Sequence, residues 1–296
     1  MSSAAVAPAP QIGRERTYLQ DVLRRFFRHK LAIIGLLILL IEIGLVIFAG
    51  QIAHHDPFAT DPTAFGARPG PAHLLGADSL GRDVFARLLY GGRISLAVGL
   101  VSTAVGLVIG VPLGLVAGFR GGVVDQLIMR AADVFMAFPS IILILMLVAV
   151  IGPSIWSVMG VIGLLGWPFF ARLIRGNVLS LREREFVQGA RALGARDLHI
   201  MVRHILPNSL APILVAATFR ISQSMLLEAS LSFLGMGVQP PQASWGNMLY
   251  DAQSITTLAT RPWMWMPAGV AIILSVLSIN FVGDGIRDAL DPKMKM

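Results

Sequence analysis

Four polar residues recur at helical spacing within one apolar stretch of this chain. Arg220, Ser224 and Glu228 are four residues apart, and Gln223 lies beside them. On a helix this spacing places the first three on one face, over about 12 Å at 1.5 Å per residue. Charges inside a long apolar helix are costly and often mark the path of a polar solute. We predict that these residues contribute to a substrate pathway; the structural alternative is pairing with neighbouring helices.

Other residues that could do chemistry are few. Glu42 lies in the first apolar run and, with Glu228, would be a proton carrier if the chain were an ion-coupled transporter. Three adjacent residues, His54, His55 and Asp56, do not predict a metal site, because neighbours in an extended loop rarely converge on one ion. The chain has no cysteine, so disulfides and thiol chemistry are excluded. We predict no catalytic residue and no metal site.

The chain also lacks a nucleotide-binding loop. Its three lysines, Lys30, Lys293 and Lys295, do not follow a glycine-rich turn of the P-loop type. We therefore expect no cofactor in this chain. If ATP and magnesium drive it, partner subunits must bind them.

The elements that position these residues are membrane helices. Of the 296 residues, 55% are hydrophobic and 14% are charged, against roughly 25% charged in soluble proteins. The apolar runs approach or exceed the ~20 residues that cross a bilayer as a helix, and they lack the alternation of barrel strands. We predict an all-α, polytopic membrane helical bundle. Its six transmembrane helices are expected at about 31–51, 92–118, 131–151, 156–174, 209–235 and 264–283.

Loop charges predict the topology, because basic loops stay in the cytoplasm. The connections carry net charges of +4 (14–30), −1 (52–91), +1 (119–130), 0 (152–155), +4 (172–203) and 0 (236–263). Both termini are therefore expected in the cytoplasm, and the net charge of +7 reflects membrane topology rather than nucleic-acid binding. The predicted division is a cytoplasmic tail (1–30), a first span with its outer loop (31–91), the main membrane domain (92–283) and a second cytoplasmic tail (284–296).

The two long outer loops have a pattern of their own. Val84, Phe85, Leu88 and Leu89 recur at helical spacing and predict a short helix on the membrane surface. Three tryptophans of the second loop suit an interfacial aromatic belt: Trp245, Trp263 and Trp265. The loops serve either structural packing or the docking of an external partner.

A charged segment, 186–208, separates two apolar runs. Its pattern predicts a helix, a break at Gly194 and a second helix along the inner face of the membrane, with Leu198, Met201, Val202 and Ile205 on one side. The pattern alone leaves two interpretations open. One is an interfacial helix pair held by anionic lipid, and the other is a docking site for a cytoplasmic protein.

This segment resembles a motif of binding-protein-dependent ABC importer permeases: Glu-Ala-Ala, three residues, Gly, nine residues, and Ile-x-Leu-Pro. The chain has Gln188-Gly189-Ala190, then Gly194, then His204-Ile205-Leu206-Pro207, with both spacings kept and three substitutions. Four blocks are similar to the C-type permease of the dipeptide/oligopeptide/nickel importer family: HLLGADSLGRDVFARLLYGGRISL, VQGARALGARDLHIMVRHILPNSLAPI, EASLSFLGMGVQPPQASWGNML and GDGIRDALDP. The likeness covers roughly residues 20 to 292.

The resemblance implies an ABC importer type I permease fold and a coupling helix near 185–194 that docks in a cytoplasmic ATPase. The implied contact residues are Glu185, Phe186, Val187, Gln188, Gly189, Ala190, Arg191, Leu193 and Gly194. Gly194 would supply a sharp turn, and Gly189 would weaken the helix by up to ~1 kcal/mol relative to alanine.

The resemblance further implies a bacterial inner-membrane permease subunit for peptide uptake that does not itself hydrolyse ATP. Its partners would be a second permease, two ATPase subunits, an extracytoplasmic substrate-binding protein and membrane lipid. Nickel chelates and glutathione are alternative substrates within the family. The alternatives from other classes are an ion-coupled secondary transporter and a membrane scaffold without a pathway.

Overall fold

Residues 18–290 of the computed structural model are described; they form helices and turns, with no strand among them. In chain order the helices are α1 (Tyr18–Phe26), α2 (Lys30–Ile47), α3 (Ala49–Ile52), α4 (Val84–Arg120), α5 (Gly122–Met136), α6 (Ser140–Ile151), α7 (Ile155–Leu164), α8 (Trp167–Leu181), α9 (Glu185–Ala192), α10 (Asp197–Ile200), α11 (Leu206–Phe233), α12 (Trp245–Met248), α13 (Ile255–Thr260) and α14 (Met266–Leu290). A π-helical turn (Met201–Ile205) joins α10 to α11, and 3-10 turns lie at Pro62–Ala64, Leu249–Gln253 and Pro262–Met264.

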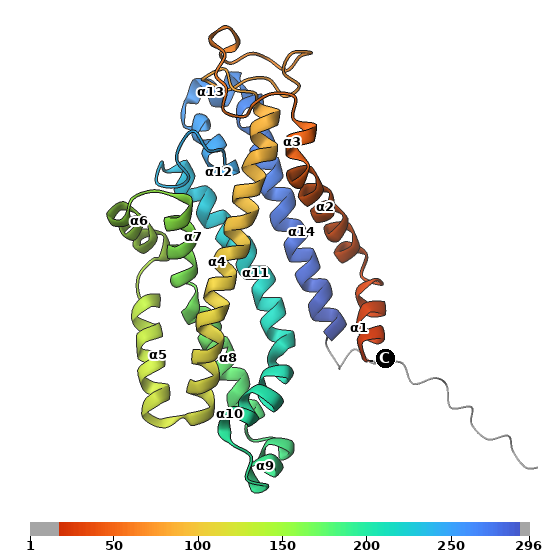
Figure 1. Cartoon of the computed structure of the whole chain (residues 1–296), viewed down its shortest axis with the longest axis vertical. Helices are drawn as coiled ribbons and strands as arrows, with labels where there is room; N and C mark the ends of the chain where they lie inside the picture. The colour runs from red at the N-terminus through yellow and green to blue at the C-terminus, as the bar shows by residue number, and fades with distance from the viewer. Residues whose placement is uncertain (1–17, 291–296) are drawn as a thin grey trace, which may run out of the picture.

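The long helices run side by side along the longest axis of the molecule (Figure 1). The loop 53–83 and α13 lie at one end, and α9 and α10 lie at the other. Five helical stretches are long and apolar enough to cross a membrane, and a bent pair adds a sixth if it counts as one span. The prediction of a polytopic helical bundle is confirmed.

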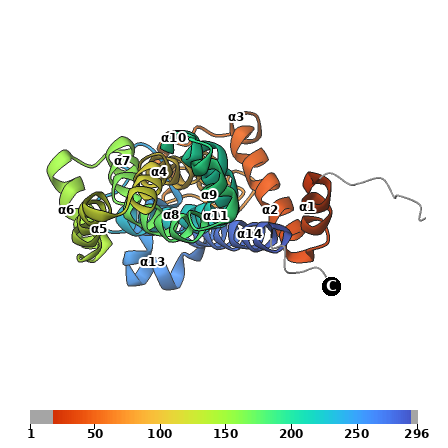
Figure 2. The ribbon, with the colours of Figure 1, turned by 90° about the horizontal axis from the view of Figure 1, so that it is seen from below.

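The third predicted span, 131–151, is not a straight helix. It is divided between α5 and α6, which meet at an angle of 85°. The break falls before Pro139, and a residue that precedes proline is disfavoured in helical conformation. The twelve residues of α6 reach only about 18 Å, less than the ~30 Å of a bilayer core. Seen from below, α5 and α6 form one edge of the molecule, opposite α1 and α2 (Figure 2).

Helix α4 begins earlier than predicted. Its first residue is Val84, and Asp83 caps it by accepting a hydrogen bond from the Ala86 N–H. The expected short surface helix is therefore wrong, since these residues are the first turns of α4. Val84 and Leu89 are buried, and Val84 shares an apolar cluster with Met225 of α11 and Trp245 of the outer loop.

A row of glycines lets α4 pack closely on α8. Gly106, Gly110, Gly114 and Gly118 recur every fourth residue and face α8. A methyl group on Gly110 would lie 2.5 Å from the Trp167 carbonyl oxygen. Small residues allow helix backbones to approach closely within membranes. Here they join α4 and α8 along most of their shared length.

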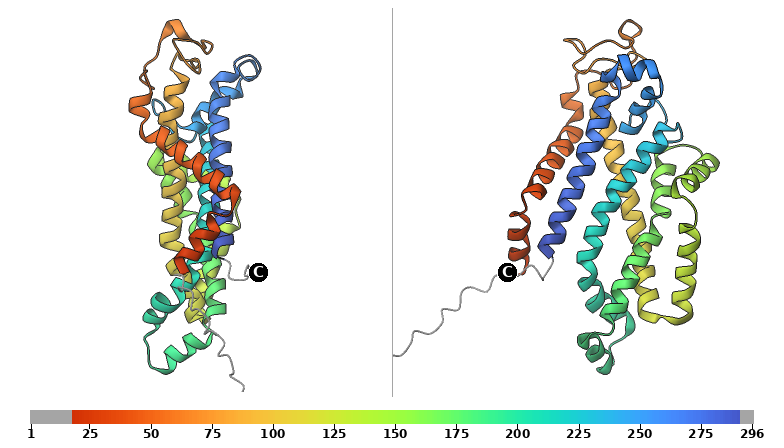
Figure 3. Two further views of the ribbon diagram at one scale, coloured as in Figure 1. Left: turned by 90° about the vertical axis from the view of Figure 1, so that its right-hand side faces the viewer. Right: turned by 180° about the vertical axis from the view of Figure 1, so that it is seen from behind.

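The structure adds a helix within the predicted first tail and lengthens the last predicted span. Helix α1 occupies Tyr18–Phe26 within the tail predicted for 1–30, and α14 continues to Leu290, past the predicted end at 283. Residues 1–17 and 291–296 lie outside the described part of the chain. The ends of α1 and α14 lie toward the same end of the bundle as α9 (Figure 3).

The two outer loops pack against each other and on α4. The Ser79 hydroxyl donates to the Asp251 carboxylate over 2.9 Å and links the loops. Trp245 is 2% exposed and its indole N–H donates to the Leu88 carbonyl. The expected place of Trp245 in an interfacial belt is therefore wrong: its ring packs on Gly92 of α4. Trp263 and Trp265 are partly buried.

Candidate functional site

Helix α9 contains most of the predicted coupling residues and ends in a defined turn. Gly194 has φ +77°, a conformation in which glycine has no side-chain penalty. The Gly194 N–H donates to the Arg191 carbonyl, and the Ala195 N–H donates to that of Ala190. This pair of bonds closes a helix whose next residue is left-handed. The predicted sharp turn at Gly194 is confirmed.

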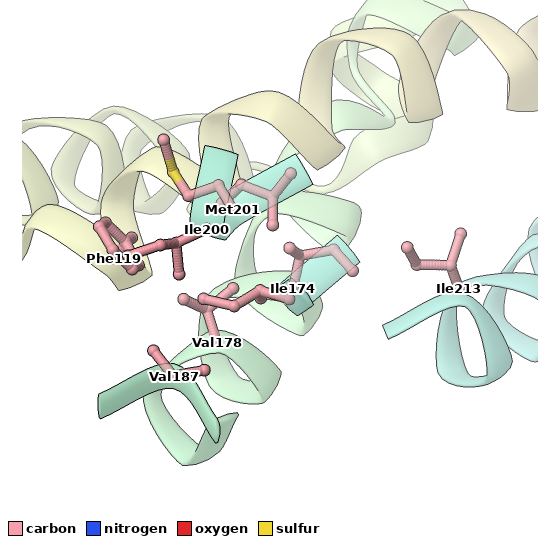
Figure 4. Packing of buried hydrophobic residues seen from close by; sticks show 9 residues of the cluster. Phe119, Ile174, Val178, Val187, Ile200, Met201 and Ile213 are labelled. Carbon is pink, nitrogen blue, oxygen red and sulfur yellow. The ribbon is translucent and has the colours of Figure 1, made fainter. Parts of the chain in front are cut away.

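One residue of α9 anchors it to the bundle. Val187 is fully buried in an apolar cluster with Phe119 of α4, Ile174 and Val178 of α8, and Ile200 (Figure 4). Fully burying a valine side chain contributes on the order of 1.5–3 kcal/mol. The cluster therefore joins α9 to α4, to α8 and to the helix that continues into α11.

Two polar residues of α9 are bound to its own bundle. The Gln188 side-chain amide donates to the Arg182 carbonyl over 2.9 Å. The Arg191 guanidinium lies 5.2 Å from the centre of the Phe119 ring, in cation–π geometry. Both side chains thus help to orient α9. Both are also exposed, so a partner can contact them.

The apolar residues at the tip are exposed. Leu193 is 90% exposed, Leu198 is 68% exposed and Phe186 is 43% exposed. The apolar residues of this segment are therefore divided, since Val187 is buried while Phe186 and Leu193 are not. A cluster of exposed large apolar side chains around a tight turn is typical of a protein-docking surface. Glu185 and Gly189 are exposed beside it, and Ala190 is half-buried.

The second helix of this segment does not lie along the membrane as predicted. Residues 197–233 form one helical stretch, in which α10 continues through the π-helical turn into α11. Ile200 and Ile205 are both fully buried although they are five residues apart, as a turn with i→i+5 hydrogen bonds allows. Leu198 and Val202 were expected on the same side as Met201 and Ile205, but the first two are exposed and the last two are buried.

The four predicted pathway residues lie along α11 but do not form one cluster. The Arg220 guanidinium donates to the Gln223 side-chain oxygen over 3.2 Å and lies close to Gly166. The Ser224 hydroxyl is buried and has no hydrogen-bond partner among the described residues. Glu228, two turns further, is completely buried. Among the residues described, Arg220 and Glu228 form no ion pair with each other.

Three serines surround the Glu228 carboxylate. The hydroxyls of Ser95 and Ser232 donate to it over 3.0 and 2.7 Å, and Ser244 lies beside Ser232. Of these, Ser232 is detectable from sequence because it lies one turn after Glu228. Ser95 is distant in the chain and Ser244 lies in the loop that follows α11, and neither has a sequence signal. In the first span, Glu42 accepts a hydrogen bond from Ser275 of α14 over 2.5 Å.

Comparison with known proteins identifies the family. A family model for the binding-protein-dependent transport system inner membrane component matches residues 110–296, more than half of the chain. The chain belongs to this family. A second model, the N-terminal TM domain of oligopeptide transport permease C, matches residues 17–70 of this chain. The resemblance to a C-type permease is therefore confirmed.

Individual relatives agree with this assignment. The component is 44% identical over 95% of its length to a glutathione transport system permease protein of Pectobacterium atrosepticum, covering 93% of it. It is 42% identical over 93% of its length to a dipeptide transport system permease protein of Alkalihalophilus pseudofirmus, covering 90% of it. The inward-facing MetNI methionine ABC transporter has a chain with a TM-score of 0.57 and 23% identity, covering 69% of this chain and 97% of the other. That likeness confirms the ABC importer permease fold.

Proposed function

We propose that this inner-membrane component is the permease subunit of an ATP-driven importer and that α9 transmits the motion of a cytoplasmic ATPase. The observation that carries the proposal is the form of α9. Buried Val187 fixes it to the bundle, while Leu193 at its tip is 90% exposed. An apolar tip on an anchored helix is suited to insertion into a groove of a partner.

The partner subunits follow from what the chain lacks. Its sequence has no P-loop, so ATP and magnesium are bound by two ATPase subunits. A second permease completes the pathway, and an extracytoplasmic binding protein delivers the solute to the outer loops. On this proposal the purified chain alone hydrolyses no ATP.

The proposed substrate is a dipeptide or oligopeptide. Support comes from the relatives, which are named for dipeptide and glutathione transport. Glutathione is itself a short peptide, and it remains the second candidate. The proposal of a peptide pathway along α11 rests on the polar side chains of Arg220, Gln223 and Ser224.

The proposed orientation places α9 in the cytoplasm. The +4 charge of residues 172–203 favours this side. The ends of α1 and α14 lie toward the same end of the bundle (Figure 3), which agrees with cytoplasmic termini.

Crosslinking tests the proposed docking surface. The chain has no native cysteine, so Leu193→Cys and Ile255→Cys each introduce one reactive site. Both positions are at least 83% exposed, and Ile255 lies in α13 at the opposite end. We expect Leu193→Cys to crosslink to the co-expressed ATPase subunit and Ile255→Cys not to. Crosslinking from position 255 alone would overturn the proposed orientation and function together.

A further inference from the structure

Three metal-ligating side chains converge at the outer end of the molecule. They are His55, which follows α3, His73 in the loop 53–83, and Asp83, the capping residue of α4. One ligand atom from each lies within 4.8 Å of the other two. The cluster does not use the adjacent run that starts at His54, because the fold combines His55 with two distant residues.

Local contacts hold these side chains in place. His73 Nδ1 and Asp83 Oδ2 are 2.9 Å apart. The other carboxylate oxygen of Asp83 accepts from the Ala86 N–H. A ring nitrogen of His55, Nε2, is 2.8 Å from the Ala72 carbonyl, and its ring centre lies 4.9 Å from that of His73. The contacts to the backbone groups of Ala72 and Ala86 are of the kind that orients metal-binding side chains.

The burial of the three residues differs in a way that suits a bound ion. The Asp83 side chain is 4% exposed and that of His73 is 13% exposed. His55 is on the surface. An ion would therefore reach the cluster from outside, past His55, and meet a carboxylate that the protein already orients.

The ligand set indicates the class of metal. Two imidazoles and one carboxylate are typical of zinc and neighbouring transition ions, whereas magnesium prefers all-oxygen ligands. Ligand atoms of a tetrahedral zinc ion lie roughly 3.4 Å apart, given bonds of about 2.0–2.1 Å. Atoms already within 4.8 Å need only small side-chain movements to reach that geometry.

We propose that His55, His73 and Asp83 bind one divalent transition ion of the zinc class, which fastens the loop 53–83 to the start of α4. Binding would join α3, the loop and the first turn of α4. This site is separate from α9 and from the polar face of α11. It goes beyond the proposed function, and its test requires neither transport nor the partner subunits.

The first test measures zinc binding by the purified full-length chain, without an affinity tag and after treatment with a chelator. We expect one equivalent of zinc by calorimetry and no comparable binding of magnesium. His55→Ala and His73→Asn should each weaken zinc binding at least tenfold. His54→Ala is the matched control, because His54 is adjacent but outside the cluster, and it should bind as the unmodified chain does.

A second measurement separates a specific site from general surface binding. Zinc should slow proteolysis of the loop 53–83 in the unmodified chain and in His54→Ala, but not in His55→Ala. Because replacement of His55 also removes its contacts to Ala72 and His73, each variant is compared with itself, with and without zinc. Equal losses in His54→Ala and His55→Ala, or stoichiometric zinc binding that survives both His55→Ala and His73→Asn, would overturn the proposal.

Discussion

The Ser95 hydroxyl of α4 donates a hydrogen bond to the Glu228 carboxylate of α11 over 3.0 Å. The same hydroxyl oxygen accepts a hydrogen bond from the backbone N–H of Trp245 over 3.1 Å. One hydroxyl thus connects two spanning helices and the outer loop. Because all three groups are buried, loss of the hydroxyl leaves a carboxylate oxygen and a backbone N–H without this partner. This contact ties Glu228 to α4 and to the outer loop, and its place in a substrate pathway stays a prediction.

We predict that Ser95→Ala destabilises the chain by about 1–3 kcal/mol, the cost of an unsatisfied buried polar group. Thermal unfolding in detergent measures the effect. Ser230→Ala is the control, since the Ser230 hydroxyl bonds only to the Leu226 carbonyl of its own helix among the described residues. Equal stability of the two variants would contradict the role given to Ser95.

Gly110→Ala should weaken the contact between α4 and α8. The added methyl group would meet the Trp167 carbonyl at 2.5 Å, and overpacking of this kind typically costs about 1–3 kcal/mol. Gly176→Ala is matched to it, because no atom lies within 4 Å of the new methyl group. We expect a lower unfolding temperature for Gly110→Ala and an unchanged or higher one for Gly176→Ala.

Gly194→Ala should reduce ATP-driven uptake by the assembled transporter. Its φ of +77° disfavours alanine, although no atom lies within 4 Å of the added methyl group. The effect therefore acts through backbone conformation, at a cost of about 1 kcal/mol. Gly194→Asn should restore part of the uptake, since asparagine tolerates this conformation better. Gly189→Ala, at an unobstructed helical position, should keep full uptake.

The loops should respond to pH through Asp251. Burial raises the pKa of its carboxyl above the usual range, and the hydrogen bond from Ser79 partly offsets this. Folding therefore disfavours the charged carboxylate, which lowers the stability of the fold at a pH above the raised pKa. This loss of stability disappears as the pH falls below the unfolded-state pKa of about 4. Asp251→Asn should unfold at a higher temperature than the unmodified chain at pH 7, with the difference vanishing in acid.

Asp61 provides a control of opposite sign for the pH measurement. Hydrogen bonds from Thr63 lower the pKa of its carboxyl, so its charged form is favoured by folding. Asp61→Asn should therefore be less stable than the unmodified chain at neutral pH. If both variants shift in the same direction, the assignment of these pH effects to local contacts is wrong.

Arg220 tests the predicted pathway. Arg220→Leu removes the guanidinium and its bond to Gln223, and correct membrane assembly is checked by pull-down of the partner subunits. We expect a lower uptake rate and an altered preference among peptides with different charges. Unchanged uptake and unchanged preference in an assembled complex would remove Arg220 from the pathway.

The spanning helices were predictable because their apolar runs are long. The broken third span was not predicted, although Pro139 and the preceding Phe138 offered a signal for it. The helix end at Gly194 was predictable, because a glycine after an amphipathic run predicts a helix end. Local patterns could not show that Leu193 is exposed while Val187 is buried, because that depends on Phe119 and Val178 from other helices.

The same limit applies to the sites that distant residues build. Ser95 and Glu228 form a hydrogen bond although more than a hundred residues separate them in the sequence. Asp83, at the start of α4, likewise lies close to His55 from an earlier part of the chain. Apolar periodicity specifies which side of a helix is buried but not which polar residue of another helix meets it. Those pairings come from the packing of α4.

Helix α4 is continuous through Pro112, with Phe119 in the cluster that holds α9 and Gly92 against Trp245 of the outer loop. These two contacts lie about 40 Å apart along the helix axis at 1.5 Å per residue. On the proposed function, a partner that displaces α9 also displaces the outer loop, because both contact the same continuous helix. The cytoplasmic contact and the outer loop would then move together, as parts of one rigid helix.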